Sequence, residues 1–365
     1  MLVLLSKWLA HWFGPARLLN SYLVLIGLGT FATAVITWIL LEKQALFHLV
    51  PRDRGKQLVE GGHVSKGKPT GVGLLLTLFT LPVLVLLMPP SLKMWEVIGC
   101  LFVAMCTGFL DDSAHMPWGE FKKGMLDFLI CVACSIALCQ FEPVRMWLPL
   151  LKGDFLVSPW LFIPVSSVIL WLAINATNCT DGVDGLAGTL SLLSLLYLGA
   201  FLYGVVGYKP ISTYLLVTHN PEGAQWAFLV FTYIGTLAAY LWYNAEPSQM
   251  LMGDAGSRPL GLLMGVAVMA SGNPFLIVVA APIILVNGGT GLIKLALLRI
   301  VKRMGFETAA DTASPPVKLL HKVRFPLHDH CRKHLKWSNA QVLMRFALLQ
   351  ALLIPLLLVL LLKLR

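Results

Sequence analysis

Long apolar runs alternate with short polar segments along almost the whole chain. A helix that crosses a membrane needs about 20 residues. Nine runs reach or approach that length, and a tenth, residues 259–270, is short. Charged residues are rare inside these runs. The pattern therefore predicts an all-α integral membrane protein with about ten transmembrane helices. The predicted spans are residues 20–41, 70–89, 94–110, 124–141, 159–176, 186–206, 224–242, 259–270, 274–298 and 339–362.

The N-terminal segment differs from these spans. It is too short to cross a membrane, and it combines Trp8 and Trp12 with the basic Arg17. Aromatic and basic side chains on a short helix are typical of a helix that lies in the membrane interface. We predict an interfacial amphipathic helix over residues 1–19. Residues 20–365 are predicted to form a single polytopic transmembrane domain that carries any catalytic function.

Composition excludes an ordinary soluble domain, because 57% of the residues are hydrophobic and only 13% are charged, against about a quarter in soluble proteins. The net charge of +10 does not indicate nucleic acid, since the basic residues lie in loops between spans. Five loops carry 18 Lys and Arg, against 8 in the segments on the other side. The positive-inside rule makes the five loops cytoplasmic and both termini external. These loops are residues 42–69, 111–123, 177–185, 243–258 and 299–338.

The most polar break in the apolar pattern is the stretch Asn175–Gly188. Asp181 and Asp184 are three residues apart, so they share a face near the positive end of the next helix if that helix begins here. This spacing suits a phosphate and the metal ion that accompanies it. An Asp-x-x-Asp pair alone is more often a solvated helix cap, so the other loops must decide.

All five predicted cytoplasmic loops carry a similar set of acidic, basic, amide and glycine residues. This shared composition indicates one site built from several loops. The polar motifs are His63–Thr70, Gly108–Asp112 followed by Lys122-Lys123, Asn175–Gly188, Asn244–Ser257 and Phe325–His330.

Five carboxylates at one membrane face would repel one another unless a hard cation or protons neutralised them. Oxygen ligands favour Mg²⁺ or Mn²⁺, and Mg²⁺ usually takes one or two carboxylates together with substrate phosphates. The lysines of the same loops would meet the remaining phosphate charge. The carboxylates are Asp111, Asp112, Asp181, Asp184 and Asp254, and the lysines are Lys66, Lys68, Lys122 and Lys123.

Two histidines, His328 and His330, lie in the most basic loop. Two histidines with one spacer can bind zinc, but no third zinc ligand follows the pattern and the neighbours are cationic. The sequence therefore favours phosphate or diphosphate contacts for this pair.

On these motifs the chain resembles the polyprenyl-phosphate N-acetylhexosamine-1-phosphate transferases, and among them the bacterial phospho-N-acetylmuramoyl-pentapeptide transferases. The motifs occur in the family's order over nearly the whole chain. The resemblance implies ten transmembrane helices and a cytoplasmic active site. It also implies that undecaprenyl phosphate attacks UDP-MurNAc-pentapeptide with Mg²⁺, which releases UMP and forms lipid I. A homodimer in contact with membrane lipid is the implied assembly.

The resemblance also assigns roles to the acidic residues. Asp254 is the implied magnesium ligand, with Asp181, and Asn178 supports the metal and the diphosphate. Asp111 and Asp112 orient the lipid phosphate or take its last proton. The implied catalytic set is Asp111, Asp112, Asp254 and His328.

The implied substrate contacts surround this set. Gly182, Val183 and Asp184 correspond to the uracil-binding segment, and His330 joins His328 at the diphosphate or sugar. The remaining implied contacts are Lys66, Thr70, Lys123, Asn178, Asp181, Asn244 and Leu251.

The chain departs from the family pattern at four places. The first loop is one residue shorter, so Lys66 and Lys68 compete for one role. Asp329 stands between two histidines where the muramoyl branch has a third, and Arg258 replaces a small or apolar residue. Leu251 stands where the family tends to place an aromatic that stacks on uracil, an interaction worth on the order of 1–3 kcal/mol. We therefore expect weaker binding of nucleoside inhibitors than is usual, and tighter binding in a Leu251→Phe variant.

Three other functions compete with this interpretation. A related enzyme would use UDP-GlcNAc, although the segment Trp337–Phe346 favours the muramoyl branch. A transporter would place polar groups near mid-membrane, and only Asp127 and Lys294 fit that description. A relative that binds substrate without turnover is the third, because the departures cluster near the site.

Overall fold

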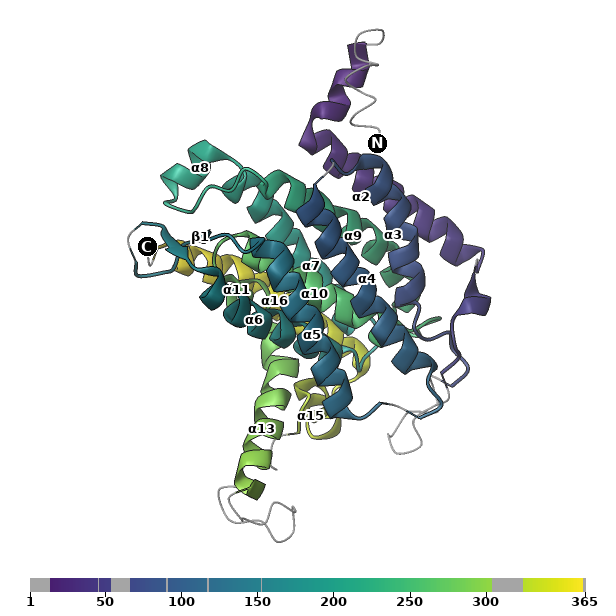
Figure 1. Cartoon of the computed structure of the whole chain (residues 1–365). Helices are drawn as coiled ribbons and strands as arrows, with labels where there is room; N and C mark the ends of the chain where they lie inside the picture. Colours follow the sequence, from purple (N-terminus) through teal and green to yellow (C-terminus); the bar gives the residue numbers. More distant parts are fainter. Residues whose placement is uncertain are drawn as a thin grey trace.

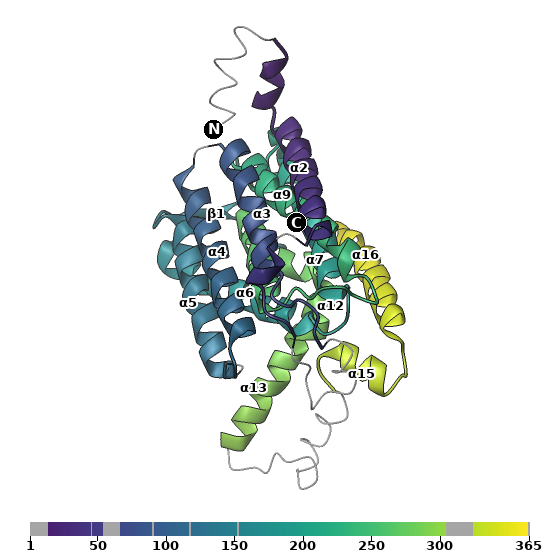
Figure 2. The ribbon, with the colours of Figure 1, turned by 90° about the vertical axis from the view of Figure 1, so that its right-hand side faces the viewer.

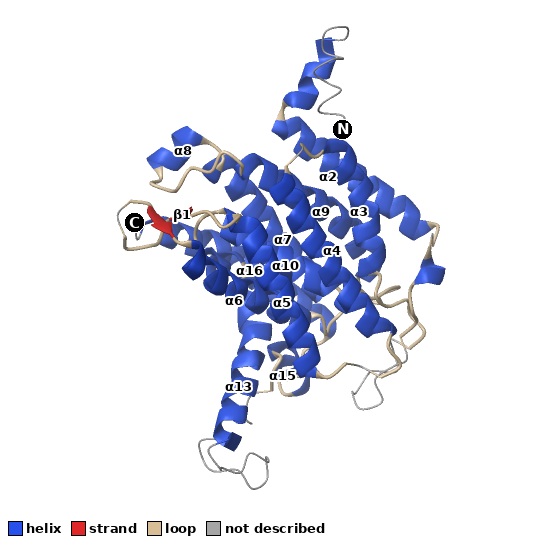
Figure 3. Ribbon diagram, in the orientation of Figure 1, coloured by secondary structure: helices blue, strands red, loops and turns tan. Residues whose placement is uncertain are grey.

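The computed structural model describes residues 14–44, 46–53, 66–89, 91–116, 118–151, 153–303 and 324–363. These residues form a helical bundle, with one antiparallel hairpin that pairs β1 (Val144–Met146) with β2 (Phe155–Val157) (Figure 3). The helices in chain order are η1 (Gly14–Asn20), α2 (Tyr22–Glu42), η2 (Phe47–Leu49), α3 (Gly73–Leu87), α4 (Leu92–Ser113), α5 (Glu120–Cys139), α6 (Pro159–Thr180), α7 (Leu186–Phe201), η3 (Leu202–Val206), α8 (Lys209–Tyr214), α9 (Gly223–Asn244), α10 (Asp254–Ala270), α11 (Leu276–Ala280), α12 (Pro282–Ile284), η4 (Leu285–Gly289), α13 (Thr290–Arg303), α15 (Leu327–Lys333) and α16 (Asn339–Lys363).

Each of the ten predicted spans contains a helix, which agrees with an all-α, multi-pass membrane protein. Seven described segments are long and apolar enough to cross a membrane. The other predicted spans lie at α3, α5 and α10. Helix α3 has 15 residues and α10 has 17, while four charged residues lie within the first eight positions of α5. The total of ten crossings therefore stays a prediction.

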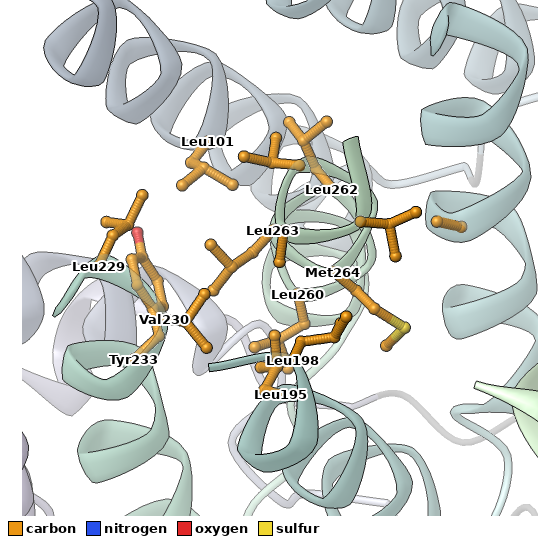
Figure 4. Close-up of a cluster of buried hydrophobic side chains, with 14 of the residues drawn as sticks. Leu101, Leu195, Leu198, Leu229, Val230, Tyr233, Leu260, Leu262, Leu263 and Met264 are labelled. Atoms are coloured by element: carbon orange, nitrogen blue, oxygen red, sulfur yellow. The ribbon is translucent and has the colours of Figure 1, made fainter. Parts of the chain in front are cut away.

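Helix α10 lies at the centre of the bundle. Every residue from Ala255 to Ala270 is buried, which is typical of a helix surrounded by other helices. Its apolar side chains pack against α4, α7 and α9, as Figure 4 shows for Leu101, Leu195, Leu198, Leu229, Val230, Tyr233, Leu260, Leu262, Leu263 and Met264. Because neighbouring helices enclose it on all sides, α10 can carry a charged residue that never meets lipid.

The outer helices have the opposite character. Helix α2 packs on α9, and α16 packs on α7 (Figure 2). Their outward faces expose large apolar side chains, such as Phe31 on α2 and Leu352 on α16, which are 71% and 68% exposed. Apolar surface of this extent needs lipid or a partner to cover it. It agrees with a membrane location.

The polar motifs gather where several helices end. The last turn of α4, the first turn of α5, the end of α6 and the start of α10 contribute side chains to one region, and α13 and α15 extend beyond the bundle (Figure 1). Of the predicted interfacial helix, residues 14–19 fall in η1 and residues 1–13 lie outside the described part. His63 to Ser65 and residues 304–323 also lie outside it.

Candidate active site

The acidic end of α4 meets a lysine from α5 and an arginine from α10. Asp111 and Lys123 form an ion pair. Lys123 Nζ also lies 3.4 Å from Asp254 Oδ2, and Arg258 Nη2 lies 2.7 Å from the same oxygen. Arg258 Nη2 is 3.7 Å from Asp111 Oδ2. The structure thus brings together Asp111, Lys123 and Asp254, three residues that were selected from two of the five predicted loops.

A third carboxylate, that of Asp127, joins this group. Arg258 is 0% exposed, and its Nη1 lies 3.4 Å from Oδ1 of Asp127, whose side chain is 2% exposed. A buried charge without a partner is strongly destabilising. Asp127 of α5 and Arg258 of α10 therefore neutralise each other's buried charge. From the sequence, Asp127 fitted only a transporter, and Arg258 was only a departure from the family pattern. In the fold they form one ion pair beside Asp254.

Asp112 has a different role from its neighbour Asp111. Its Oδ1 accepts a hydrogen bond from the backbone N–H of Asp254 at 3.1 Å, and its Oδ2 accepts one from Ala255 at 3.0 Å. The first N–H groups of a helix have no partner within the helix and favour an anion. Asp112 therefore caps α10 and sets the position of Asp254 relative to α4. Its implied contact with the lipid phosphate stays a prediction.

Two glycines surround the Asp112 carboxylate. Gly71 and Gly253 have φ of +67° and +69°, in the left-handed region that favours glycine. A Cβ on Gly253 would overlap Asp112 Oδ2, and one on Gly71 would lie 3.2 Å from it. The turn before α10 can therefore approach the α4 carboxylate only because these positions carry no side chain.

A second polar group joins the turn after α6 to the segment after α9. Asp184 Oδ2 accepts a hydrogen bond from the N–H of Ser248 at 3.1 Å and lies 3.9 Å from Lys68 Nζ. Lys68 also donates to Ser248 Oγ at 2.9 Å. Of the two lysines that competed for one role, Lys68 contacts this turn, and Lys66 is exposed.

Asp181 and Asp184 do not share a helix face, because no helix begins at either residue. Helix α6 ends at Thr180 and α7 begins only at Leu186, so both aspartates lie in the turn between the helices. The α7 N-cap is Gly185, with φ of +75°. The glycines of this segment favour a turn, and a turn separates the two carboxylates in a way that helix spacing does not.

Asn244 holds this turn in place. Its Oδ1 accepts the N–H of Gly185 at 2.8 Å, and its Nδ2 donates to the carbonyl of Met250 at 2.8 Å. The residue is 5% exposed. Leu251 continues the connection, because its N–H donates to Pro69 at 2.8 Å. Asn244 therefore links the turn after α6 to the segment after α9. The implied substrate contacts of Asn244 and Leu251 stay predictions.

His328 belongs to a third polar group, which includes a residue that the sequence analysis missed. Asn287 Oδ1 accepts the backbone N–H of His328 at 2.9 Å and lies 3.2 Å from its Nδ1, while Asn287 Nδ2 donates to Thr180 Oγ1 at 3.1 Å. The proton therefore lies on Nδ1, and Nε2 faces Gly182, where a Cβ would overlap it. The signal in the sequence was an amide directly before Gly288 in an apolar run.

Burial lowers the pKa of His328 to about 4, so the imidazole is neutral at pH 7. A histidine in the unfolded chain takes up a proton near pH ~6.5. Acidification below that value therefore favours the unfolded chain, and this effect is complete near the folded pKa. At neutral pH, His328 can accept a hydrogen bond through Nε2, but it adds no positive charge.

We expect His328 to lower the free energy of unfolding by about 3 kcal/mol as the pH falls from ~6.5 to ~4. Thermal unfolding of the wild type, of His328→Asn and of His48→Asn across this range measures the effect. His48 is exposed and serves as the matched control. The His328→Asn curve should be flatter than the other two. Three parallel curves would contradict the burial argument.

No group of three or more His, Cys, Asp or Glu within the described residues is arranged to hold a metal ion. The acidic residues are instead interleaved with cations. Four carboxylates, Asp111, Asp112, Asp127 and Asp254, face two cations, Lys123 and Arg258, which leaves a formal charge of −2. A set of oxygen donors with this excess of negative charge fits one Mg²⁺, which would bind through one or two carboxylates and also take phosphate ligands.

Comparison with known proteins agrees with this arrangement. Residues 94–272 match Glycosyl transferase family 4. A phospho-N-acetylmuramoyl-pentapeptide-transferase of Treponema pallidum subsp. pallidum is 45% identical over 368 aligned residues, covering 100% of this chain and 97% of that protein. The chain belongs to the phospho-N-acetylmuramoyl-pentapeptide transferase family.

Two further transferases of the same name are more distant relatives. The Dinoroseobacter shibae protein is 28% identical over 350 residues, covering 91% of this chain and 92% of that protein. The Bartonella quintana protein is 25% identical over 246 residues, covering 66% and 64%. Both alignments extend the likeness beyond a single motif.

The structure gives a reason why this transferase-family chain can carry Asp329 between its histidines. Asp329 Oδ1 lies 3.9 Å from Arg332 Nη1, one turn further along α15. The added negative charge is thus partly neutralised on its own helix. His330 points to another partner, since its ring stacks on His334 with centroids 4.6 Å apart.

A Gly253→Ala substitution should reduce transferase activity by about a hundredfold, because displacing Asp112 would shift Asp254, and misplacement by an ångström has effects of that size. Gly153→Ala is the matched control. Gly153 also has a positive φ, of +85°, but a Cβ there has no heavy atom within 4 Å. Initial rates on folded protein measure both variants. Equal rates of the two variants would show that contact between a Cβ at position 253 and Asp112 does not set the activity.

Proposed function

We propose that this chain transfers phospho-MurNAc-pentapeptide from UDP-MurNAc-pentapeptide to undecaprenyl phosphate, giving lipid I and UMP. The observation that carries the proposal is the 45% identity along the whole length to a phospho-N-acetylmuramoyl-pentapeptide-transferase. The arrangement of Asp111, Lys123 and Asp254 supports it, because those residues converge from the loops on which the resemblance rests.

The proposed reaction is a phosphoryl transfer, in which positioning and charge neutralisation dominate the rate. An oxygen of undecaprenyl phosphate forms a bond to the sugar-linked phosphorus of the donor. The bond from that phosphorus to the bridging oxygen breaks, and UMP leaves with the electron pair. A phosphate monoester loses its second proton near pH ~6, so the nucleophile is mostly ionised and needs little help from a general base.

In this proposal the four carboxylates and two cations described above, here called the acidic group, orient the reacting phosphates and neutralise their charge. Lys123, between Asp111 and Asp254, can turn its ammonium toward phosphate oxygens. Asp254 would hold Mg²⁺ together with Asp181, the exposed aspartate of the turn after α6. A bound Mg²⁺ would supply charge neutralisation to the diphosphate. Asp112 fixes the start of α10, so that Asp254 stays at the meeting point of α4 and α5.

The same proposal includes the orientation of the chain in the membrane. We place the end of the bundle that carries α13 and α15 in the cytoplasm, with ten crossings, both termini external and a bacterial inner membrane as the location. The excess of Lys and Arg in the five loops supports this orientation. A homodimer would cover part of the apolar outer surface.

Release of UMP from purified protein tests the proposal. Undecaprenyl phosphate is supplied with either UDP-MurNAc-pentapeptide or UDP-GlcNAc, with and without Mg²⁺. We expect turnover only with the muramoyl nucleotide and only with Mg²⁺. Turnover with UDP-GlcNAc instead would assign the chain to the sister activity, and absence of turnover with both would leave a binding protein.

A further inference from the structure

A cavity lies at the turn between α15 and α16, apart from the acidic group of Asp111, Asp112, Asp127 and Asp254. Its volume is about 740 Å³, within the range of roughly 300–1,000 Å³ that is usual for small-molecule sites. Neither the proposed catalysis nor the implied uracil site uses its walls. The side chains that matter for its chemistry are Arg324, Arg332, Lys333, His334, Lys336 and Trp337.

The walls of this cavity are strongly positive. Four of the residues are arginine or lysine, which are charged at neutral pH. Among the described residues, the one salt bridge to these cations is the 3.9 Å contact of Asp329 with Arg332. Arg345 adds a further positive charge next to Trp337, because its guanidinium lies 4.2 Å from the centroid of that ring. The cavity therefore favours an anionic ligand.

Helix α15 connects this cavity to the candidate active site. His328 contacts the turn at Gly182 at one end of the helix, and Arg332 follows it by four residues. His330 is related to His334 by the same spacing, and their rings stack. Residues four apart are neighbours on one helix face. Each histidine expected at the diphosphate or sugar thus has a neighbour in the cavity wall.

We propose that this cavity binds the peptide arm of the donor nucleotide through the carboxylate at its free end. The inference rests on the proposed function. The donor contains, in order, a nucleoside, a diphosphate, a sugar and a peptide, and the path from the uracil segment through His328 to the cavity follows this order. Arginine and lysine side chains bind carboxylates through charge-assisted hydrogen bonds.

Equilibrium titration of the full-length protein tests the assignment without turnover, because the lipid acceptor is omitted. The ligands are UDP-MurNAc-pentapeptide and UDP-MurNAc, which lacks the peptide. The test variant combines Lys333→Gln with Lys336→Gln. The matched control combines Lys302→Gln with Arg303→Gln, which removes the same charge from the exposed end of α13. A third variant, Lys333→Arg with Lys336→Arg, keeps the charge.

We expect the test variant to raise the Kd of UDP-MurNAc-pentapeptide about tenfold and to leave that of UDP-MurNAc unchanged. The control and the charge-keeping variant should match the wild type. An equal rise in Kd for both nucleotides would show that the two lysines contact the diphosphate. No rise in Kd for either nucleotide would show that the peptide does not bind in the cavity. Both results overturn the inference and leave the proposed function standing.

Two further outcomes distinguish a lipid ligand from a failure of nucleotide binding. If the test variant loses binding to phosphatidylglycerol vesicles while the donor Kd stays the same, the cavity holds a lipid headgroup and the inference is wrong. If the wild type binds neither nucleotide, the proposed function fails, and the inference that rests on it fails too. Wild-type binding of both nucleotides is therefore measured first.

Discussion

Replacement of Asp254 by asparagine is expected to lower the rate of UMP release by about a thousandfold, the scale of losing one main electrostatic group from an active site. Asp254 Oδ2 is the oxygen that Lys123 and Arg258 share, at 3.4 and 2.7 Å. The variant keeps the shape of the side chain and removes its charge. It therefore weakens both the ordering of the two cations and the proposed site for Mg²⁺.

A matched control distinguishes this effect from general damage. Glu222→Gln also removes one carboxylate from a lysine ion pair, with Lys93 at 3.1 Å, but at the N-terminal end of α9. Its activity should stay within about twofold of the wild type, since partly exposed ion pairs contribute little. Rates are compared over a range of Mg²⁺ concentrations, alongside thermal unfolding of each protein. An active Asp254→Asn protein with an unchanged Mg²⁺ dependence would refute the assignment.

Replacement of Arg258 by leucine should lower the free energy of unfolding by about 3–5 kcal/mol, because it leaves the buried Asp127 without its partner. Adding Asp127→Leu should recover most of the loss, since two well-packed apolar residues often replace a buried ion pair without penalty. The double-mutant cycle, measured by unfolding in detergent, gives the coupling between the two positions. Additive losses would show that Asp127 and Arg258 act independently.

The activity of the double variant shows whether Arg258 also acts through Asp254. Arg258 also contacts Asp254 at 2.7 Å, so the stable double variant should remain slower than the wild type by at least about tenfold. A double variant that regains both stability and full rate would limit Arg258 to neutralising Asp127. Asp127→Leu alone serves as the reference, because it leaves Arg258 paired with Asp254 and Asp111.

The elements themselves could be predicted well from the sequence. The apolar runs indicated helices at each of the ten places, since a run of about 20 apolar residues is a local property of the chain. The polar motifs were also recognisable, and their order matched the family. Boundaries at the polar ends were less certain. Whether a helix begins at Asp181 was left open by the sequence, and the structure places Asp181 and Asp184 in the turn between α6 and α7.

Partnerships between distant residues could not be predicted in the same way. Asp127 lies inside a predicted span and Arg258 at the end of a predicted loop, and the sequence does not state that they face each other. Asn244 was selected for its type, yet its described bonds go to Gly185 and Met250. Asn287 was not selected at all, because a single amide in an apolar segment resembles many that have no role.

The sequence by itself therefore determined the membrane class, the helices and the residue types available to the site. Only the tertiary structure decided which carboxylate caps α10, which pairs with Lys123 and which is buried against Arg258. The physical reason is that hydrophobicity acts along the chain over about one helix length, whereas these charges come from α4, α5 and α10. Their pairing depends on how closely glycine-containing helix ends approach, and that is set by packing in three dimensions.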